Sequence, residues 1–152
     1  MKHLNHLLKR PLQAVPNKVV IILFIFAILG FIDSSFLTVE HFANVIPPCT
    51  TSGCETVLTS SYSTMFGIPV ALLGIIYYLL ISIGLFAHIE SKHEPSLRAI
   101  LLLTVTGFVM SMWFVAAQAF IIHSYCLYCL GSATISTILF GTSVYVLKKY
   151  RV

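Results

Sequence analysis

The first long apolar stretch, residues 19–39, reads VVIILFIFAILGFIDSSFLTV and contains a single charged side chain, Asp33. A hydrocarbon core about 30 Å thick is crossed by roughly 20 helical residues. Three further stretches reach that length, at about residues 68–89, 97–122 and 127–147. They predict an all-α, polytopic membrane protein, built as a four-transmembrane-helix bundle.

The composition supports this class of protein. Of the 152 residues, 58% are hydrophobic and 9% are charged, whereas about a quarter of the residues of a soluble domain are charged. We expect one membrane domain over residues 1–152, with an extracytoplasmic loop at about 40–67. A cleaved signal peptide would be the alternative for the first span, but no A-x-A-like cleavage site follows it.

The basic residues indicate the orientation, because Lys and Arg beside a span favour the cytoplasmic side. All nine precede the first span, lie between the second and third, or follow the fourth: Lys2, Lys9, Arg10, Lys18, Lys92, Arg98, Lys148, Lys149 and Arg151. Both termini are therefore expected in the cytoplasm. Because topology accounts for the net charge of +4, we expect no nucleic-acid partner.

The four cysteines form two close pairs. Cys49 and Cys54 lie in the first loop, and Cys126 and Cys129 lie at the start of the fourth span. The predicted topology puts all four on the extracytoplasmic face, where disulfides are stable, so they are candidate redox groups. Chance apolar cysteines, purely structural disulfides or one zinc ion bound by all four thiolates remain alternatives, although we expect no metal.

The loop pair lies in a segment with helical signals. Ser52 and Glu55 form an S-x-x-E capping box, which predicts a helix start. Apolar residues then recur at helical spacing and predict a short amphipathic lid helix: Cys54, Val57, Leu58, Tyr62 and Met65. Cys54 would occupy the second helical position, where the helix dipole favours a thiolate. Cys49 follows two prolines and can be presented to another protein.

The second pair lies in HSYCLYCLG, residues 123–131. Ser124 is the expected N-cap of the fourth span, which would place Cys126 in the first turn and Cys129 one turn deeper. Two pairs on one side of a membrane can pass oxidation between them by thiol–disulfide exchange. Because the chain has no haem-attachment motif and no dinucleotide fingerprint, a lipid-soluble quinone near Cys129 is the expected electron acceptor.

Four motifs together resemble a known family. DSSFLTVEH covers residues 33–41, CTTSGCETVLTSSY covers 49–62, FGIPVALLG covers 66–74, and CLYC covers 126–129. The combination resembles the vitamin K epoxide reductase family in its bacterial, quinone-linked form without a fused thioredoxin domain. The resemblance extends over about residues 30–131 and takes in all four spans.

The resemblance implies a relay around a bound ubiquinone or menaquinone. In it, Cys49 exchanges with a partner protein, Cys54 attacks Cys126, and the released Cys129 thiolate meets the quinone. The partner would be a separate periplasmic thioredoxin-fold protein of the DsbA-like kind. The chain would lie in the bacterial cytoplasmic membrane with its active site facing the periplasm.

The expected quinone-lining residues come from three parts of the chain: Ser60, Phe66, Trp113, Phe114 and Ala133. Gln118 is a further candidate, although residues of this kind in the third span also occur in ordinary helix packing. Animal members have a tyrosine, associated with vitamin K and anticoagulant binding, at the position of Ala133. The alanine favours a plain quinone and disulfide formation over recycling of vitamin K epoxide.

Asp33 lies in the last turns of the first span, where a lipid-facing carboxylate costs a few kcal/mol. We expect it to face the bundle, as a proton relay or as a group that tunes the cysteines. An interfacial polar residue without a role is the alternative.

Two other classes of protein fit part of these observations. A DsbB-type quinone-linked oxidase of separate ancestry also has four spans and two cysteine pairs, but its C-x-x-C pair comes first and its second pair lies in a longer loop. A non-catalytic structural or metal-binding membrane protein is the other alternative.

Overall fold

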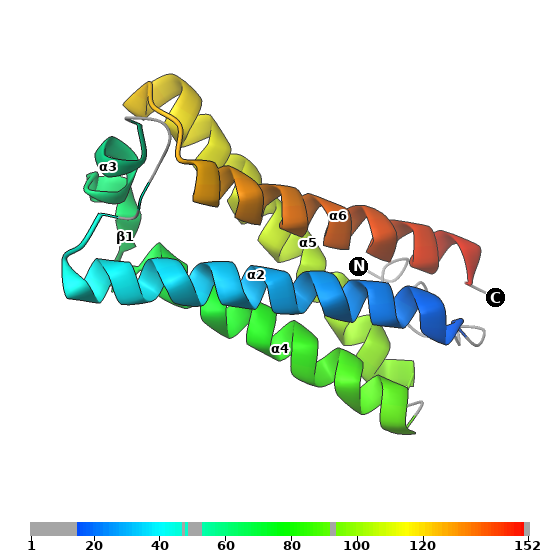
Figure 1. Cartoon of the computed structure of the whole chain (residues 1–152). Helices are drawn as coiled ribbons and strands as arrows, with labels where there is room; N and C mark the ends of the chain where they lie inside the picture. The colour runs from blue at the N-terminus through cyan, green and yellow to red at the C-terminus, as the bar shows by residue number, and fades with distance from the viewer. Residues whose placement is uncertain (1–14, 47, 49–52, 92–93, 151–152) are drawn as a thin grey trace.

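The computed structural model describes residues 15–46, 48, 53–91 and 94–150. Four long helices dominate it (Figure 1), and each is long and apolar enough to cross a membrane. They are α2 (Asn17–Ala43), α4 (Val70–Ser91), α5 (Glu94–Ala117), which continues into the π-helical turn η2 (Gln118–Ile122), and α6 (Leu127–Lys149). The predicted four-helix architecture is confirmed.

The helices pack in a ring. Helix α2 contacts α4 and α6, and α5 contacts the same two helices. Large apolar side chains are buried between them, among them Leu23, Ile81 and Leu139. Two glycines allow aromatic rings to enter the bundle, because a Cβ on Gly30 would collide with Tyr78 and one on Gly107 would collide with Tyr77. Many other apolar side chains face outward, as expected of helices in lipid.

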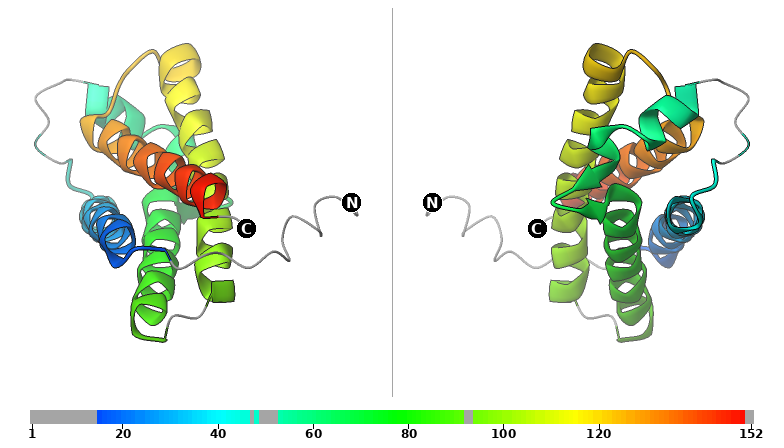
Figure 2. Two further views of the ribbon diagram at one scale, coloured as in Figure 1. Left: turned by 90° about the vertical axis from the view of Figure 1, so that its right-hand side faces the viewer. Right: turned by 90° about the vertical axis from the view of Figure 1, so that its left-hand side faces the viewer.

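The connection between α2 and α4 folds over one end of the bundle. Its elements are α3 (Gly53–Leu58), the 3₁₀ turn η1 (Ser61–Ser63) and a hairpin of β1 (Thr64–Met65) and β2 (Ile68–Pro69). Figures 1 and 2 show α3 at the end of the bundle where α5 is followed by α6. The described ends of the chain, the start of α2 and the end of α6, lie at the opposite end.

Helix α3 is shorter than the sequence predicts. It ends at Leu58, so the expectation that it continues through Tyr62 and Met65 is wrong. The hydroxyls of Thr59 and Ser60 donate 2.7 Å hydrogen bonds to the carbonyl oxygens of Glu55 and Val57. Such local bonds compete with the next helical turn, and they end the helix here. Ser52 of the expected capping box lies outside the described residues.

Candidate active site

The inner cysteine pair lies at the start of α6. Cys126 is itself the N-cap of this helix: its backbone is extended (φ −101°, ψ 121°), and its thiol accepts a 3.5 Å hydrogen bond from the Cys129 N–H. The expectation that Ser124 caps the helix is therefore wrong. His123 has a left-handed conformation (φ 54°), which ends η2 and leaves only a short reversal before α6. The thiol of Cys126 thus replaces the hydroxyl of a usual cap.

Gln118 holds this reversal in place. Its side-chain Oε1 accepts a 2.9 Å hydrogen bond from the backbone N–H of Cys126, and its carbonyl oxygen accepts one of 3.2 Å from the N–H of Ser124. The residue is buried within the π-helical turn. The sequence offered Gln118 only as a cavity-lining candidate, and its positioning role was missed. A polar residue near the end of an apolar span was the available signal.

The loop helix brings Cys54 to the inner pair. Cys54 and Cys126 are both fully buried and share one apolar cluster with Val57, and Cys129 packs against this cluster. The approach is close, because a Cβ on Gly53 would lie 2.6 Å from the carbonyl oxygen of Tyr125. The structure therefore joins two parts of the chain that are far apart in sequence.

The cysteines differ in redox state. Cys54 is disulfide-bonded, whereas Cys126 and Cys129 are free thiols. Cys49, the predicted partner-facing cysteine, lies outside the described residues.

The environment of Cys126 favours its thiolate. A side-chain hydrogen bond from Cys129 lowers the pKa of the Cys126 thiol to about 7, and the backbone N–H groups of Cys129 and Tyr128 act in the same direction. Burial and the nearby Asp33 carboxylate oppose this shift of the pKa. The start of α6 thus supplies the kind of N–H donors that stabilise reactive thiolates. The same effect at Cys54 stays a prediction, because this cysteine is disulfide-bonded.

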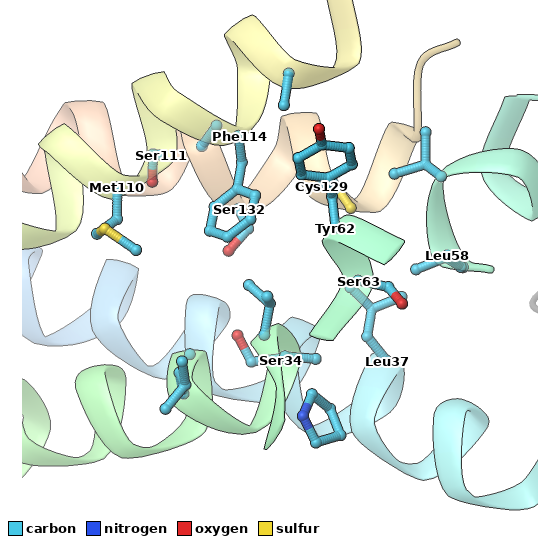
Figure 3. A pocket seen from close by; sticks show the side chains of 18 of the residues that line it. Ser34, Leu37, Leu58, Tyr62, Ser63, Met110, Ser111, Phe114, Cys129 and Ser132 are labelled. Carbon is cyan, nitrogen blue, oxygen red and sulfur yellow. The ribbon is translucent and has the colours of Figure 1, made fainter. Parts of the chain in front are cut away.

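A cavity of about 320 Å³ opens beside Cys129, a volume typical of small-molecule sites. Its wall is mostly apolar. All four long helices and the loop contribute to it: Ser34 and Leu37 from α2, Gly74, Tyr77 and Tyr78 from α4, Met110 and Phe114 from α5, Cys129, Ser132 and Ala133 from α6, and Val57, Ser60 and Tyr62 from the loop. Figure 3 shows Cys129 and Ser132 across the cavity from Ser34 and Leu37.

The structure brings some of the predicted lining residues together and leaves others apart. Ser60, Phe114 and Ala133 lie in the cavity wall, as does Gln118. Phe66 and Trp113 do not belong to the wall. Phe66 is 99% exposed at the turn of the hairpin, and Trp113 is 55% exposed on the outer face of α5. For Trp113 the cause is helical geometry, since its neighbour Phe114 occupies the inward direction.

Asp33 belongs to a polar group just behind the cavity wall. Its carboxyl lies beside the Ser132 hydroxyl, and its charge acts on both Cys126 and Cys129. The Tyr78 hydroxyl is 3.0 Å from both Oγ and the carbonyl oxygen of Ser132. Asp33 therefore lies at the inner cysteine pair and the cavity, although it does not itself line the cavity.

This arrangement suits electron transfer between thiols and an apolar molecule. Cys126 shares a buried cluster with the disulfide-bonded Cys54, Cys129 packs against this cluster, and Cys129 borders the cavity. Cysteines packed together in this way can exchange a disulfide. The cavity can hold a ring-sized apolar group beside Cys129.

Comparison with known proteins agrees with this geometry. The model of the vitamin K epoxide reductase family matches residues 21–144, a range that includes Cys54, Cys126, Cys129 and nearly all of the four long helices. Comparison with curated protein sequences gives no match. The chain belongs to the vitamin K epoxide reductase family, and this membership makes it a multi-pass membrane redox enzyme.

Proposed function

We propose that the chain is a thiol oxidase that oxidises a dithiol protein and reduces a membrane quinone, and so supports disulfide formation. The observation that carries the proposal is the position of the inner pair. Cys126 shares a buried cluster with Cys54, and Cys129 borders the apolar cavity. The overall reaction is balanced: a dithiol and a quinone give a disulfide and a quinol, with two electrons and two protons transferred.

The proposed order of exchange is the one that the resemblance to the family implies, and the contact of Cys54 with the cluster around Cys126 supports it. The partner reduces the Cys49–Cys54 disulfide, and Cys54 then attacks Cys126. Cys129 leaves as a thiolate and then takes up a proton, and Cys49 regenerates the outer disulfide by attacking Cys54. The lowered pKa of Cys126 makes it a stable thiolate once it is released, since a low-pKa thiol is the better leaving group.

A ubiquinone or menaquinone is the proposed electron acceptor. The vitamin K epoxide reductase family is quinone-linked in general, and the cavity is apolar with hydroxyls at a few positions, such as Ser34, Ser60 and Ser132. Ala133 lies in its wall beside Cys129, and its small side chain leaves room for the ring. In this proposal the site serves disulfide formation rather than recycling of vitamin K epoxide.

The proposed partner is a separate periplasmic thioredoxin-fold protein of the DsbA-like kind. Members of the family typically work with thioredoxin-fold partners. The positions of the basic residues favour cytoplasmic termini and an active site that faces the periplasm in a bacterial cytoplasmic membrane. Cys49 is the cysteine proposed to meet the partner.

Thiol labelling tests the proposal. The purified, reduced protein is labelled with a maleimide before and after addition of a short-chain ubiquinone, and the labelled cysteines are identified by mass spectrometry. We expect quinone to abolish labelling of Cys126 and Cys129. Labelling that does not respond to quinone, together with stoichiometric zinc in the purified protein, would support the non-catalytic alternative.

The partner is tested separately with Cys54→Ala. This variant retains Cys49 but cannot resolve a mixed disulfide through Cys54. We expect a thioredoxin-fold protein to accumulate in a mixed disulfide with Cys49 in membranes isolated from the cells. If no such protein accumulates, or if it is bound to Cys126, then Cys49 is not the cysteine that exchanges with the partner.

A further inference from the structure

Asp33 is a carboxyl group within a membrane-spanning helix. It lies in α2 (Asn17–Ala43), and its Oδ2 atom is buried and has no hydrogen-bond partner in the described part of the chain. No basic residue in that part acts on it. A carboxyl at this depth is costly and is retained mainly where it serves a pathway for ions or protons.

The groups that face Asp33 connect it to the cavity. From α6, the Ser132 hydroxyl lies beside the carboxyl, and Cys126 and Cys129 are within reach of its charge. From α4, Tyr78 is also within reach of its charge, and its hydroxyl contacts Ser132 Oγ at 3.0 Å. Ser132 and Tyr78 both line the cavity. These hydroxyls can receive and donate a proton.

Ser132 lies three residues after Cys129 on α6, so the two side chains are neighbours on one helix face. Both border the cavity, as Figure 3 shows. A proton that leaves Cys129 therefore has a hydroxyl and a carboxyl close by, while the rest of the wall is mostly apolar.

We propose that Asp33 carries the proton of Cys129, through the Ser132 hydroxyl, to the quinone that occupies the cavity. The inference rests on the proposed function and adds a route for one of its two protons. When the Cys126–Cys129 disulfide forms, the S–H bond of Cys129 breaks and two electrons pass to the quinone. Asp33 takes this proton and returns it to a quinone oxygen. The second proton reaches the quinone from solvent and replaces the one that the Cys126 thiol releases near neutral pH.

Asp33→Asn removes the proton carrier and keeps the size of the side chain. The reduced, full-length protein is mixed with a short-chain ubiquinone, and the single-turnover rate of quinone reduction is followed by absorbance. Because positioned acid–base groups contribute about 10²-fold or more, we expect a loss of about a hundredfold at neutral pH. The loss should shrink toward acid pH, where hydronium replaces the missing carrier. Exchange between Cys54 and Cys126 should keep its rate.

Two further variants separate proton transfer from structure. Asp33→Glu should recover most of the rate, since it restores a carboxyl. Glu40→Gln is the matched control, because Glu40 is on the same helix and also has a buried, unpaired oxygen. Its rate should equal that of the wild type. If Asp33→Asn does not fold, Ser132→Ala takes its place, and we expect a slower quinone reduction with unchanged thiol exchange.

Several results would overturn the inference. They are a wild-type rate in Asp33→Asn at every pH, equal slowing of quinone reduction and thiol exchange, a failure of Asp33→Glu to recover activity, or a wild-type rate in Ser132→Ala. Absence of quinone reduction in the wild-type protein is a different result, because it would contradict the proposed function itself.

Discussion

The side chain of Gln118 accepts a 2.9 Å hydrogen bond from the backbone N–H of Cys126. This bond joins η2 to the start of α6 and holds Cys126, which shares a buried cluster with Cys54. Buried N–H groups almost always have a partner, and here a side chain supplies it. The geometry of the inner cysteine pair therefore depends on a residue that takes no part in sulfur chemistry.

Gln118→Leu should destabilise the protein and slow exchange between Cys54 and Cys126. The substitution leaves the Cys126 N–H without an acceptor, which costs about 1–3 kcal/mol for a buried group. Thermal unfolding in detergent and the rate of exchange check the two effects. Gln118→Glu keeps an acceptor oxygen and should be the less destabilised variant. An unchanged unfolding temperature in Gln118→Leu would contradict the role given to this bond.

Gly53→Ala should separate the two cysteine pairs. The added Cβ would lie 2.6 Å from the Tyr125 carbonyl oxygen and 2.8 Å from its nitrogen, so α3 must shift away from Cys126. We expect at least tenfold slower exchange between the pairs, measured by trapping thiols with a maleimide during a single turnover.

Gly131→Ala is the control for this change. Gly131 lies in α6, where a Cβ would meet no atom within 4 Å, and alanine is the better helix former by about 1 kcal/mol. Its exchange rate should match that of the wild type. Similar slowing in both variants would mean that the contact of Gly53 with Tyr125 is not what matters.

The thiol of Cys126 should titrate below an ordinary cysteine. In a variant with Cys49→Ala and Cys54→Ala, a pH titration followed by thiolate absorbance reports Cys126 and Cys129 alone. Because the Cys129 side chain lowers the pKa of Cys126 to about 7, we expect a first midpoint near that pH, below the value of about 8.5 for a free thiol. The thiolate thus predominates above the midpoint and is lost as the pH falls.

Adding Cys129→Ala to this variant should raise the midpoint, since the largest cause of the lowered pKa is removed. A midpoint that stays unchanged would show that the backbone N–H groups, rather than the second cysteine, stabilise the thiolate.

Ala133→Phe should weaken quinone binding. Ala133 is buried in the cavity wall, and a phenyl ring there would occupy space that we assign to the quinone. We expect at least a tenfold higher KM for a short-chain ubiquinone, with little change in exchange between Cys54 and Cys126. Thr134→Phe adds the same ring at the next, exposed position and should leave the KM unchanged. Equal KM values for the two variants would contradict this position of the site.

The four spans could be predicted from the sequence because hydropathy and length decide them almost alone. The expected fourth span and the observed α6 both begin at Leu127. Helix α3 was predicted too long, since apolar spacing through Met65 gave no sign that the hydroxyls of Thr59 and Ser60 would bond the preceding carbonyls. Local hydrogen bonds of this kind compete with helix periodicity.

In the candidate site too, some residues could be predicted from local sequence patterns, and others depend on contacts that only the fold shows. Cysteine spacing identified Cys126 and Cys129, and polarity within a span singled out Asp33. The roles of Gln118 and Gly53 depend on contacts across the bundle, which no local pattern reveals. Phe66 is expected at the quinone because the resemblance places its segment there, and Trp113 is expected there as an aromatic residue of the third span. The hairpin turn and the face of α5 direct both side chains away from the cavity.

Quinone turnover in Cys129→Ser tests the central claim most directly, because Cys129 is a free cysteine that borders the cavity. The purified wild type and this variant are supplied with a small dithiol and a short-chain ubiquinone, and quinol formation is measured. We predict turnover in the wild type, residual turnover in Cys49→Ser and none in Cys129→Ser. Equal turnover in the wild type and Cys129→Ser would contradict the assignment.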